Sequence, residues 1–435
     1  MPSAERPVPS PFEIIRDPLW DNIQLDAAAL SVLDTPPLQR LRYVRQLGHA
    51  FLVYPGATHS RFEHALGAYH LAGRALTVLQ QRGELEAVSP GHQRAVRLAA
   101  LVHDIGHYPF SHGLEEAGFP HHESLGVAKL TRGELGQALD SLGGPALVAE
   151  IGTLIQGTNP GPLQGLVSGT LDLDKIDYLS RDARACGVPY GTLDVDRLLS
   201  ALTIVATPDG RLEVGILEKG MSALETLLFA KYQMYRNVYW HHAVRAATCM
   251  FKRAVRAAVA SGGLSREALA EETDGALMER LFSSDPTGLA RAVHERRLYK
   301  RALDLPASEV PDGAGDWIGD NPDLLERVED AVAAELGLGP AGLLLDYPAR
   351  PNMLGVDIML ATRDGRAERL TDEGRAGHLG LPRIGAELYR SARHLRVFTA
   401  APLPLPNATD RLRALASLPP AELTLRLTQS RPLLP

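Results

Sequence analysis

Apolar side chains recur at helical spacing over most of the first 260 residues. The periodicity starts near Ala27, and in residues 33–43 Thr35 is a candidate N-cap followed by two prolines, which suit the first turn of a helix. Helices are also predicted over residues 61–75 and 92–105. The first part of the chain is therefore expected to be a helical core.

The pattern after this point predicts a looser helical region, a hairpin and a long helix. Helical spacing is weaker over residues 113–161, and residues 200–218 read as two strands around an Asp209-Gly210 turn. Residues 221–260 keep apolar positions on one side and predict a single helix. Further helices with loops are expected over residues 261–339.

A change of pattern near Leu343 predicts strands over residues 343–346, 355–362 and 395–399, followed by a tail rich in proline and leucine that packs on the surface. The fold class expected is mainly α, with a helical core and a small α+β C-terminal region. The domains expected are an N-terminal arm (1–28), the core (29–260), a helical extension (261–342), and the small α+β C-terminal region and tail (343–435).

Composition narrows the classes of function. Two cysteines in 435 residues give neither a disulfide framework nor a thiolate zinc site, which suits the cytoplasm. No secretory signal is evident, and the apolar runs fall short of the ~20 residues that span a bilayer. A net charge of −7 disfavours non-specific binding to nucleic acid. Any phosphate must therefore meet a local cluster of Arg and Lys.

Candidate chemistry is densest in residues 98–112, where an apolar run ends in His103-Asp104 and further histidines follow. Neighbouring residues on a helix point about 100° apart, so His103 and Asp104 can reach one ion near the end of their helix. His64 and Asp174 are candidates for the remaining ligands. A lone helical histidine is usually structural, and aspartates in such segments are usually helix caps or solvated salt bridges. Only the joint pattern favours a metal site.

That joint pattern resembles a known family. His64, His103-Asp104 and Asp174 are similar to the H…HD…D metal signature of the HD-domain phosphohydrolase superfamily. From about residue 17 to 260 the chain resembles its deoxynucleoside triphosphate triphosphohydrolase branch, in the bacterial form without a SAM domain. The blocks that carry this resemblance are residues 35–42, 46–48, 59–67, 103–112, 122–124 and 172–182.

The resemblance implies a role for each matching residue. One divalent metal (Mn, Fe, Mg, Ni or Zn) would be ligated by His64, His103, Asp104 and Asp174. The catalytic residues would be His122, Glu123, His107 and Asp104. His122 would protonate the leaving oxygen, and Glu123 would orient the His122 ring. The substrate would be bound by Gln46, Arg61, His107, His112, Lys175, Tyr178, Asp182, Lys231 and Tyr239.

These substrate residues divide by the part of the nucleotide that each would meet. Arg61 and Lys175 would bind triphosphate oxygens, and His107 and His112 would hold phosphate oxygens or the attacking water. The sugar would lie near Tyr178 and Asp182, and Gln46 would lie close to the sugar and base. Positive charge beside a polyphosphate is what phosphoryl chemistry requires.

Three features depart from the family pattern or leave a choice. Lys231 stands where an arginine is usual, which keeps the charge but loses the planar fork. Glu115 stands where the family has an aspartate near its catalytic histidine. His121 precedes His122, and the His-Glu pairing favours His122 as the catalytic residue. A His241-His242 pair is a candidate second metal site, although helix packing is the stronger interpretation.

The function expected is hydrolysis of dNTPs to deoxynucleoside and inorganic triphosphate, with water attacking the α-phosphorus. The resemblance also implies a homo-oligomer, dimer or tetramer, with a regulatory nucleotide. The alternatives are another HD phosphohydrolase activity (nucleotide phosphatase, (p)ppGpp hydrolase or cyclic nucleotide phosphodiesterase) and a nucleotide- or nucleic-acid-binding regulator with a weak HD site.

Overall fold

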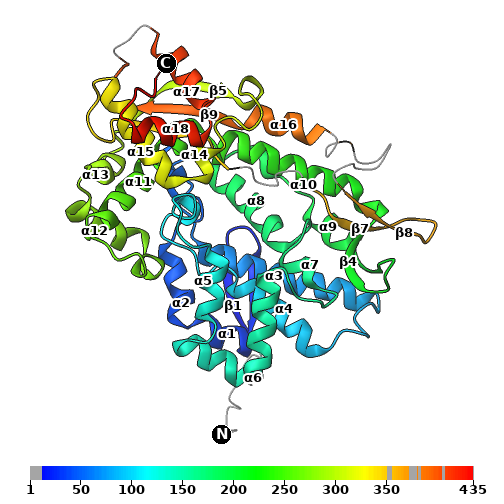
Figure 1. The fold of residues 1–435 in the computed structure, drawn as a ribbon. Helices are drawn as coiled ribbons and strands as arrows, with labels where there is room; N and C mark the ends of the chain where they lie inside the picture. The colour runs from blue at the N-terminus through cyan, green and yellow to red at the C-terminus, as the bar shows by residue number, and fades with distance from the viewer. Residues whose placement is uncertain (1–11, 350–354, 372–379, 381–383, 404–406, 435) are drawn as a thin grey trace.

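The computed structural model describes residues 12–349, 355–371, 380, 384–403 and 407–434. The protein is mainly α-helical, as the sequence predicts, with small sheets (Figure 1). The first helices of the chain lie in the lower part of that view, and the strand and helices of residues 384–434 lie at the top. The proline-rich residues 1–11, predicted to belong to an arm, lie outside the described residues.

The chain enters the fold through a β-hairpin, so the prediction of an arm is wrong for residues 12–26. Strands β1 (Phe12–Asp17) and β2 (Asp21–Asp26) pair antiparallel. The Asp17 carboxylate accepts hydrogen bonds from the backbone of Leu19 and Trp20 at 2.8 Å and closes the turn. Ile23 and Leu25 are fully buried. Their alternation is the strand signal that the neighbouring prolines obscured.

Helices build the body of the molecule up to residue 260. Ser60 and Glu63 form a capping box at the start of α3, which fixes where that helix begins. The helices are α1 (Ala27–Leu33), α2 (Pro36–Arg40), α3 (Arg61–Gln81), α4 (Pro90–Val102), α5 (His122–Lys129), α6 (Gly133–Ile155), α7 (Gln164–Val167), α8 (Leu173–Cys186), α9 (Val195–Ala201), α10 (Met221–Met234) and α11 (His242–Ala260).

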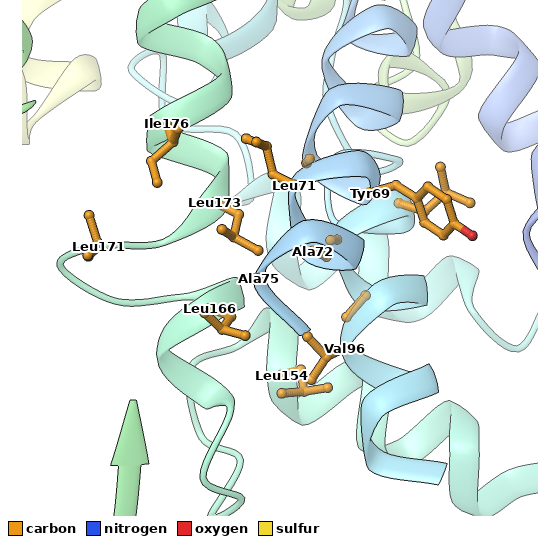
Figure 2. Close-up of a cluster of buried hydrophobic side chains, with 14 of the residues drawn as sticks. Tyr69, Leu71, Ala72, Ala75, Val96, Leu154, Leu166, Leu171, Leu173 and Ile176 are labelled. Atoms are coloured by element: carbon orange, nitrogen blue, oxygen red, sulfur yellow. The ribbon is translucent and has the colours of Figure 1, made fainter. Parts of the chain in front are cut away.

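The main hydrophobic core lies where α3, α4, α6 and α8 meet (Figure 2). Leu71 and Ala75 of α3 face Val96 of α4, Leu154 of α6 and Leu173 of α8, and all five are essentially unexposed. Burying such side chains stabilises the fold by about 1.5–3 kcal/mol for each large residue. This core fixes the ends of α3, α4 and α8, which carry the candidate metal ligands.

Helix α6 corrects the expectation that apolar runs are far too short to cross a membrane. Its 23 residues are long and apolar enough by length and composition, although only a third of its most apolar window is buried. The helix is broken, however, because Gly144 has non-helical dihedral angles (φ 66°, ψ −166°) and Pro145 follows it. Each straight part is about half the ~20 residues that a bilayer requires. Leu139 and Leu154 pack into the core.

The long helix predicted over residues 221–260 is interrupted. Helix α10 ends at Met234, a π-turn runs over Tyr235–Tyr239, and α11 begins at His242. Apolar positions recur at helical spacing on both sides of this break, so they gave no signal for it.

Two further sheets lie beyond the helical body. The predicted hairpin is β3 (Leu202–Ala206) and β4 (Leu212–Leu217), extended by β7 (Ile358–Ala361), parallel to β4, and β8 (Ala367–Leu370). The other sheet has the order β5 (Lys300–Pro306), β9 (His394–Thr399), β6 (Leu343–Asp346). Strand β5 was not predicted, because this edge strand carries charged side chains and has an irregular register.

The remaining helices surround the second sheet and α11. The tail predicted to pack on the surface instead supplies buried Leu412, Leu415 and Leu423 to a core with β5, β6 and β9. The domain boundaries stay a prediction. These helices are α12 (Asp274–Ser284), α13 (Leu289–His294), α14 (Trp317–Asp320), α15 (Pro322–Glu335), α16 (Gly385–Ala392), α17 (Ala408–Ala416) and α18 (Pro420–Thr428).

Candidate active site

The structure brings the four predicted metal ligands together. His64 lies in the first turn of α3, His103 and Asp104 at the end of α4, and Asp174 in the first turn of α8. The Nε2 atom of His64 lies 2.9 Å from Asp174 Oδ1 and 3.2 Å from His103 Nε2. The same Nε2 atom lies 3.6 Å from Asp104 Oδ2. We call these four residues the metal-ligand group.

The hydrogen bonds made by the Nδ1 atoms of His64 and His103 turn both Nε2 atoms toward the point where a cation would bind. His64 Nδ1 donates to Asp177 Oδ2 at 2.8 Å, and His103 Nδ1 donates to the Ala100 carbonyl at 2.9 Å. The Nε2 atoms of both rings therefore face the same point, where a bound cation would replace the proton that His64 Nε2 shares with Asp174. Ligand atoms about 2.1 Å from one ion lie about 3.0–3.5 Å apart, which matches the observed separations.

Electrostatics favour positive charge at the same point. Burial opposes ionisation, but neighbouring His103 and Arg61 hold the pKa of Asp104 well below its usual range. The pKa of Asp174 is likewise held well below its usual value by His103 and His64. Burial lowers the pKa of His64, but hydrogen bonds to Asp174 and Asp177 outweigh it and raise that pKa to about 10. Two ionised carboxylates therefore hold a positive charge here.

A second cluster lies beside the first. His107, His112, Glu115 and His122 each offer a ligand atom, and these atoms lie within 4.8 Å of one another. We call these residues the histidine group. Glu115 Oε1 lies 2.9 Å from His122 Nδ1 and 3.4 Å from His112 Nδ1. The rings of His107 and His122 stack at 3.7 Å.

Glu115 orients His122, and the prediction that Glu123 would do so is wrong. Glu123 is exposed in the first turn of α5 and has no hydrogen bond or ion pair with the described residues. Burial would raise the pKa of Glu115, but hydrogen bonds from His112 and His122 hold it well below its usual range. His121 is 81% exposed, which leaves His122 as the inward-facing histidine.

The two groups touch through Asp104. His107 Nε2 lies 3.1 Å from Asp104 Oδ1, and Arg61 donates to Asp104 Oδ2 at 2.6 Å. Burial and the neighbouring Arg61 hold the pKa of His107 well below its usual range, so this ring is neutral. Arg61, predicted to bind the triphosphate, is buried and also donates to Ser111 Oγ at 2.8 Å. It lies at the junction of the two groups.

Two lysines supply positive charge on the other side of the metal-ligand group. Lys175 donates to the Gly169 carbonyl at 2.8 Å and to Asp172 at 2.5 Å. Lys231 of α10 is 8% exposed. Burial, and then repulsion by Lys175, lowers the pKa of Lys231 to about 8. The two ammonium groups are therefore close enough to interact, and an anion between them would relieve their repulsion.

The predicted sugar-binding residues also meet. Tyr239 donates to Asp182 Oδ2 at 2.8 Å, and His59 Nε2 lies 2.7 Å from Asp182 Oδ1. Burial and the neighbouring Tyr235 raise the pKa of Tyr178 well above its usual value, so its phenol stays protonated. The Gln46 side-chain Oε1 is buried and has no hydrogen-bond partner among the described residues, which leaves it available to a ligand donor.

His241 and His242 do not form a second metal site among the described residues. Their rings lie 4.4 Å apart, and neither belongs to a group of three or more candidate ligands. His241 instead caps α11, where its Nδ1 accepts from the backbone of Ala243. Helix capping therefore explains this pair.

Residues that support the site were missed. Asp177 accepts hydrogen bonds from His64, from the Trp20 indole at 2.5 Å and from Arg181 at 2.9 Å. Arg181 also donates to Asp17 at 2.8 Å. The spacing of Asp174 and Asp177, three residues apart, was a usable signal, because such residues share one face of a helix. Nothing in the sequence pointed to the contact with the N-terminal hairpin.

Comparisons with known proteins agree with this geometry. Residues 61–157 match the family model described as the HD domain, and residues 193–373 match the model described as the HD associated region. An uncharacterised protein of Methanocaldococcus jannaschii is 37% identical over 293 residues, which cover 67% of this chain and 60% of that protein. Human deoxynucleoside triphosphate triphosphohydrolase SAMHD1 is 26% identical over 348 residues, which cover 66% of this chain and 54% of that protein.

Among solved structures, a phosphohydrolase from Bacteroides thetaiotaomicron has the same fold, with a TM-score of 0.69 and 23% identity over 89% of this chain and 99% of that one. The matches to the two curated relatives span only about half to three fifths of those proteins' length.

Proposed function

We propose, since this chain belongs to the HD-domain phosphohydrolase superfamily, that it hydrolyses deoxynucleoside triphosphates to deoxynucleoside and inorganic triphosphate. The observation that carries the proposal is the contact between the metal-ligand group and the histidine group through Asp104. Cationic side chains lie on both sides of that contact, at Arg61 and at Lys175. Metal ligands, a proton donor and phosphate-binding cations thus occupy one place.

The metal-ligand group would hold one divalent cation, which supplies Lewis-acid chemistry at a phosphoryl oxygen. The protein's own residues would do the rest. His122, with Nδ1 fixed by Glu115, presents Nε2 for proton transfer to the leaving oxygen. His107 stacks on it and limits its rotation. Lys175 and Lys231 would bind the triphosphate while water attacks the α-phosphorus. The bond between that phosphorus and the 5′-oxygen then breaks, the deoxynucleoside leaves with the proton from His122, and the triphosphate is released whole.

Specificity for a deoxynucleoside would come from the predicted sugar-binding residues. The protonated phenols of Tyr178 and Tyr239 and the carboxylate of Asp182 offer donors and an acceptor for a sugar. Gln46 has a free acceptor for the sugar or base. A site with this polarity suits a nucleoside better than a simple phosphate ester.

Product analysis tests the proposal. The purified protein with Mn²⁺ would be incubated with each dNTP, alone and in mixtures, and the products separated by ion-exchange chromatography. Deoxynucleoside and triphosphate are the expected products, and a higher rate in mixtures would indicate activation by a second nucleotide. Monophosphate, diphosphate or no product would reject the proposal in favour of another HD phosphohydrolase activity or a binding role.

Cytoplasmic location, assembly into a dimer or tetramer, and regulation by nucleotide remain part of the proposal. Support for them comes from the similarity to the human triphosphohydrolase and from the cysteine content. Size-exclusion chromatography with light scattering, with and without dNTPs, would measure the subunit count.

A further inference from the structure

The backbone that joins the two groups of the site makes an unusual turn. Phe110 and Ser111 both have left-handed conformations, with φ of 57° and 64°, which side-chain-bearing residues rarely adopt. Opposite them, a Cβ atom on Gly48 would lie 2.7 Å from the Phe110 carbonyl oxygen, so the two backbones pack closely. A turn of this kind persists only where its surroundings hold it. His107 lies before it and His112 after it.

The side chain that holds this turn comes from α12, far along the sequence. Asp274, the first residue of α12, is 4% exposed. Its Oδ1 accepts the Phe110 backbone N–H at 2.8 Å. Its Oδ2 accepts the Arg45 backbone N–H at 3.1 Å and lies 3.4 Å from the Arg45 guanidinium. One buried carboxylate therefore ties the turn to the segment that precedes α3.

Hydrogen bonds continue from these contacts to a metal ligand. Ser111 Oγ donates to the Arg45 carbonyl at 2.7 Å. Arg61 donates to Ser111 Oγ at 2.8 Å and to Asp104 Oδ2 at 2.6 Å. The side chain of Asp274 is thus linked to Asp104 without a break, although it touches no metal ligand itself.

A second contact from the same segment reaches the other end of the turn. Arg40 donates through its NH2 to the His107 carbonyl and through Nε to the Glu272 carbonyl at 3.0 Å. The segment at the start of α12 is therefore attached to the turn at His107 and at Phe110. Two independent contacts from outside residues 61–157 hold the backbone that places the histidine group.

We propose that Asp274 is a positioning residue of the active site, which fixes the turn at residues 107–112 so that the histidine group faces the metal-ligand group. The kinetic part of this inference rests on the proposed phosphohydrolase function. The structural part does not, because it concerns only the backbone of the turn.

Hydrogen exchange tests the structural part in the full-length protein. In Asp274→Ala, backbone amides of a peptide covering residues 105–114 should exchange about tenfold faster, because Phe110 N–H loses its acceptor. Asp285→Ala is the matched control: this aspartate, just after α12, also accepts backbone N–H groups, from Thr287 and Ala290, but does not contact the turn. Unchanged exchange in Asp274→Ala, or equal acceleration in the control, would overturn the proposal.

Kinetics test the positioning role. Asp274→Ala should lower kcat about 10–100-fold with KM nearly unchanged and metal content retained, because small displacements of catalytic groups cost this much. Asp274→Asn keeps an oxygen that can accept the Phe110 N–H but turns its NH2 group toward the Arg45 N–H, so it should recover only part of the lost kcat. Faster exchange with an unchanged kcat would also overturn the proposal. If the wild-type protein hydrolyses no dNTP, the proposed function fails, and the exchange experiment still decides the role of Asp274.

Discussion

The metal-ligand group and the histidine group lie side by side but are held in different ways. His64 is wholly unexposed, and buried Asp177 fixes its ring. In the histidine group, by contrast, His112 is 60% exposed, and its ring and that of His122 share one carboxylate, Glu115. In the first group His64 is therefore built into the core, whereas in the second His112 and His122 depend on one acceptor, Glu115.

This contrast implies that the two groups respond differently to substitution. Removing a metal ligand weakens metal binding and leaves the remaining buried charges without a partner. Metal binding and catalysis should therefore fail together. Removing a residue of the histidine group should change the rate while the metal and nucleotide stay bound. Each substitution below tests this distinction, in order of decreasing expected effect.

Replacing the His103-Asp104 pair by alanines should abolish metal binding and hydrolysis together. Two of four ligands are lost, and the carboxylate that joins the groups is lost with them. Metal content by mass spectrometry and turnover would be measured on the same preparation. His92→Ala, on the same helix and paired with Glu150, is the control and should keep both properties. Turnover retained in the double variant would contradict the metal assignment.

His122→Ala should lower the rate by ~10²–10⁴, the usual contribution of a general acid, and leave metal and nucleotide affinity nearly intact. Single-turnover kinetics and calorimetric nucleotide binding would separate the two effects. His121→Ala is the neighbouring control, and its exposed side chain should be dispensable. If His122→Ala lost nucleotide binding instead, His122 would have a structural role and the distinction between the groups would fail.

The sequence predicted the metal-ligand group well and its support poorly, for a physical reason. Ligands of one ion must be of a few residue types at restricted spacings, so His64, His103-Asp104 and Asp174 stand out along the chain. Supporting contacts need only one polar atom, and many residues can supply it. Asp177 and Asp274 act through contacts between segments more than 100 residues apart. The spacing of Asp177 from Asp174 gave a local signal, but no local pattern marks Asp274.

The same reasoning explains the errors in the fold. Helices with regular apolar faces were predicted correctly, whereas β1, β2 and β5 mix charged and apolar residues and depend on partners that no local pattern reveals. Glu123 was chosen over Glu115 because it is adjacent to His122 in the sequence. The loop that returns Glu115 to that ring is a tertiary feature.

Glu115→Gln should reduce kcat about 10–100-fold, because the neutral amide no longer fixes the His122 ring with a charged acceptor. Glu123→Gln is the matched control and should leave kcat unchanged. A larger loss in Glu123→Gln than in Glu115→Gln would restore the original assignment and contradict the geometry.

The smallest effect is expected at Lys231, whose side chain belongs to neither group. Because burial and Lys175 lower its pKa to about 8, Lys231 loses its proton as the pH rises through 8. A neutral amine binds triphosphate less well, so kcat/KM should fall roughly fivefold between pH 8 and 9. In Lys231→Arg the guanidinium stays charged, and this part of the decline should disappear. An identical decline in Lys231→Arg and wild type would assign it to another group and remove Lys231 from the triphosphate site.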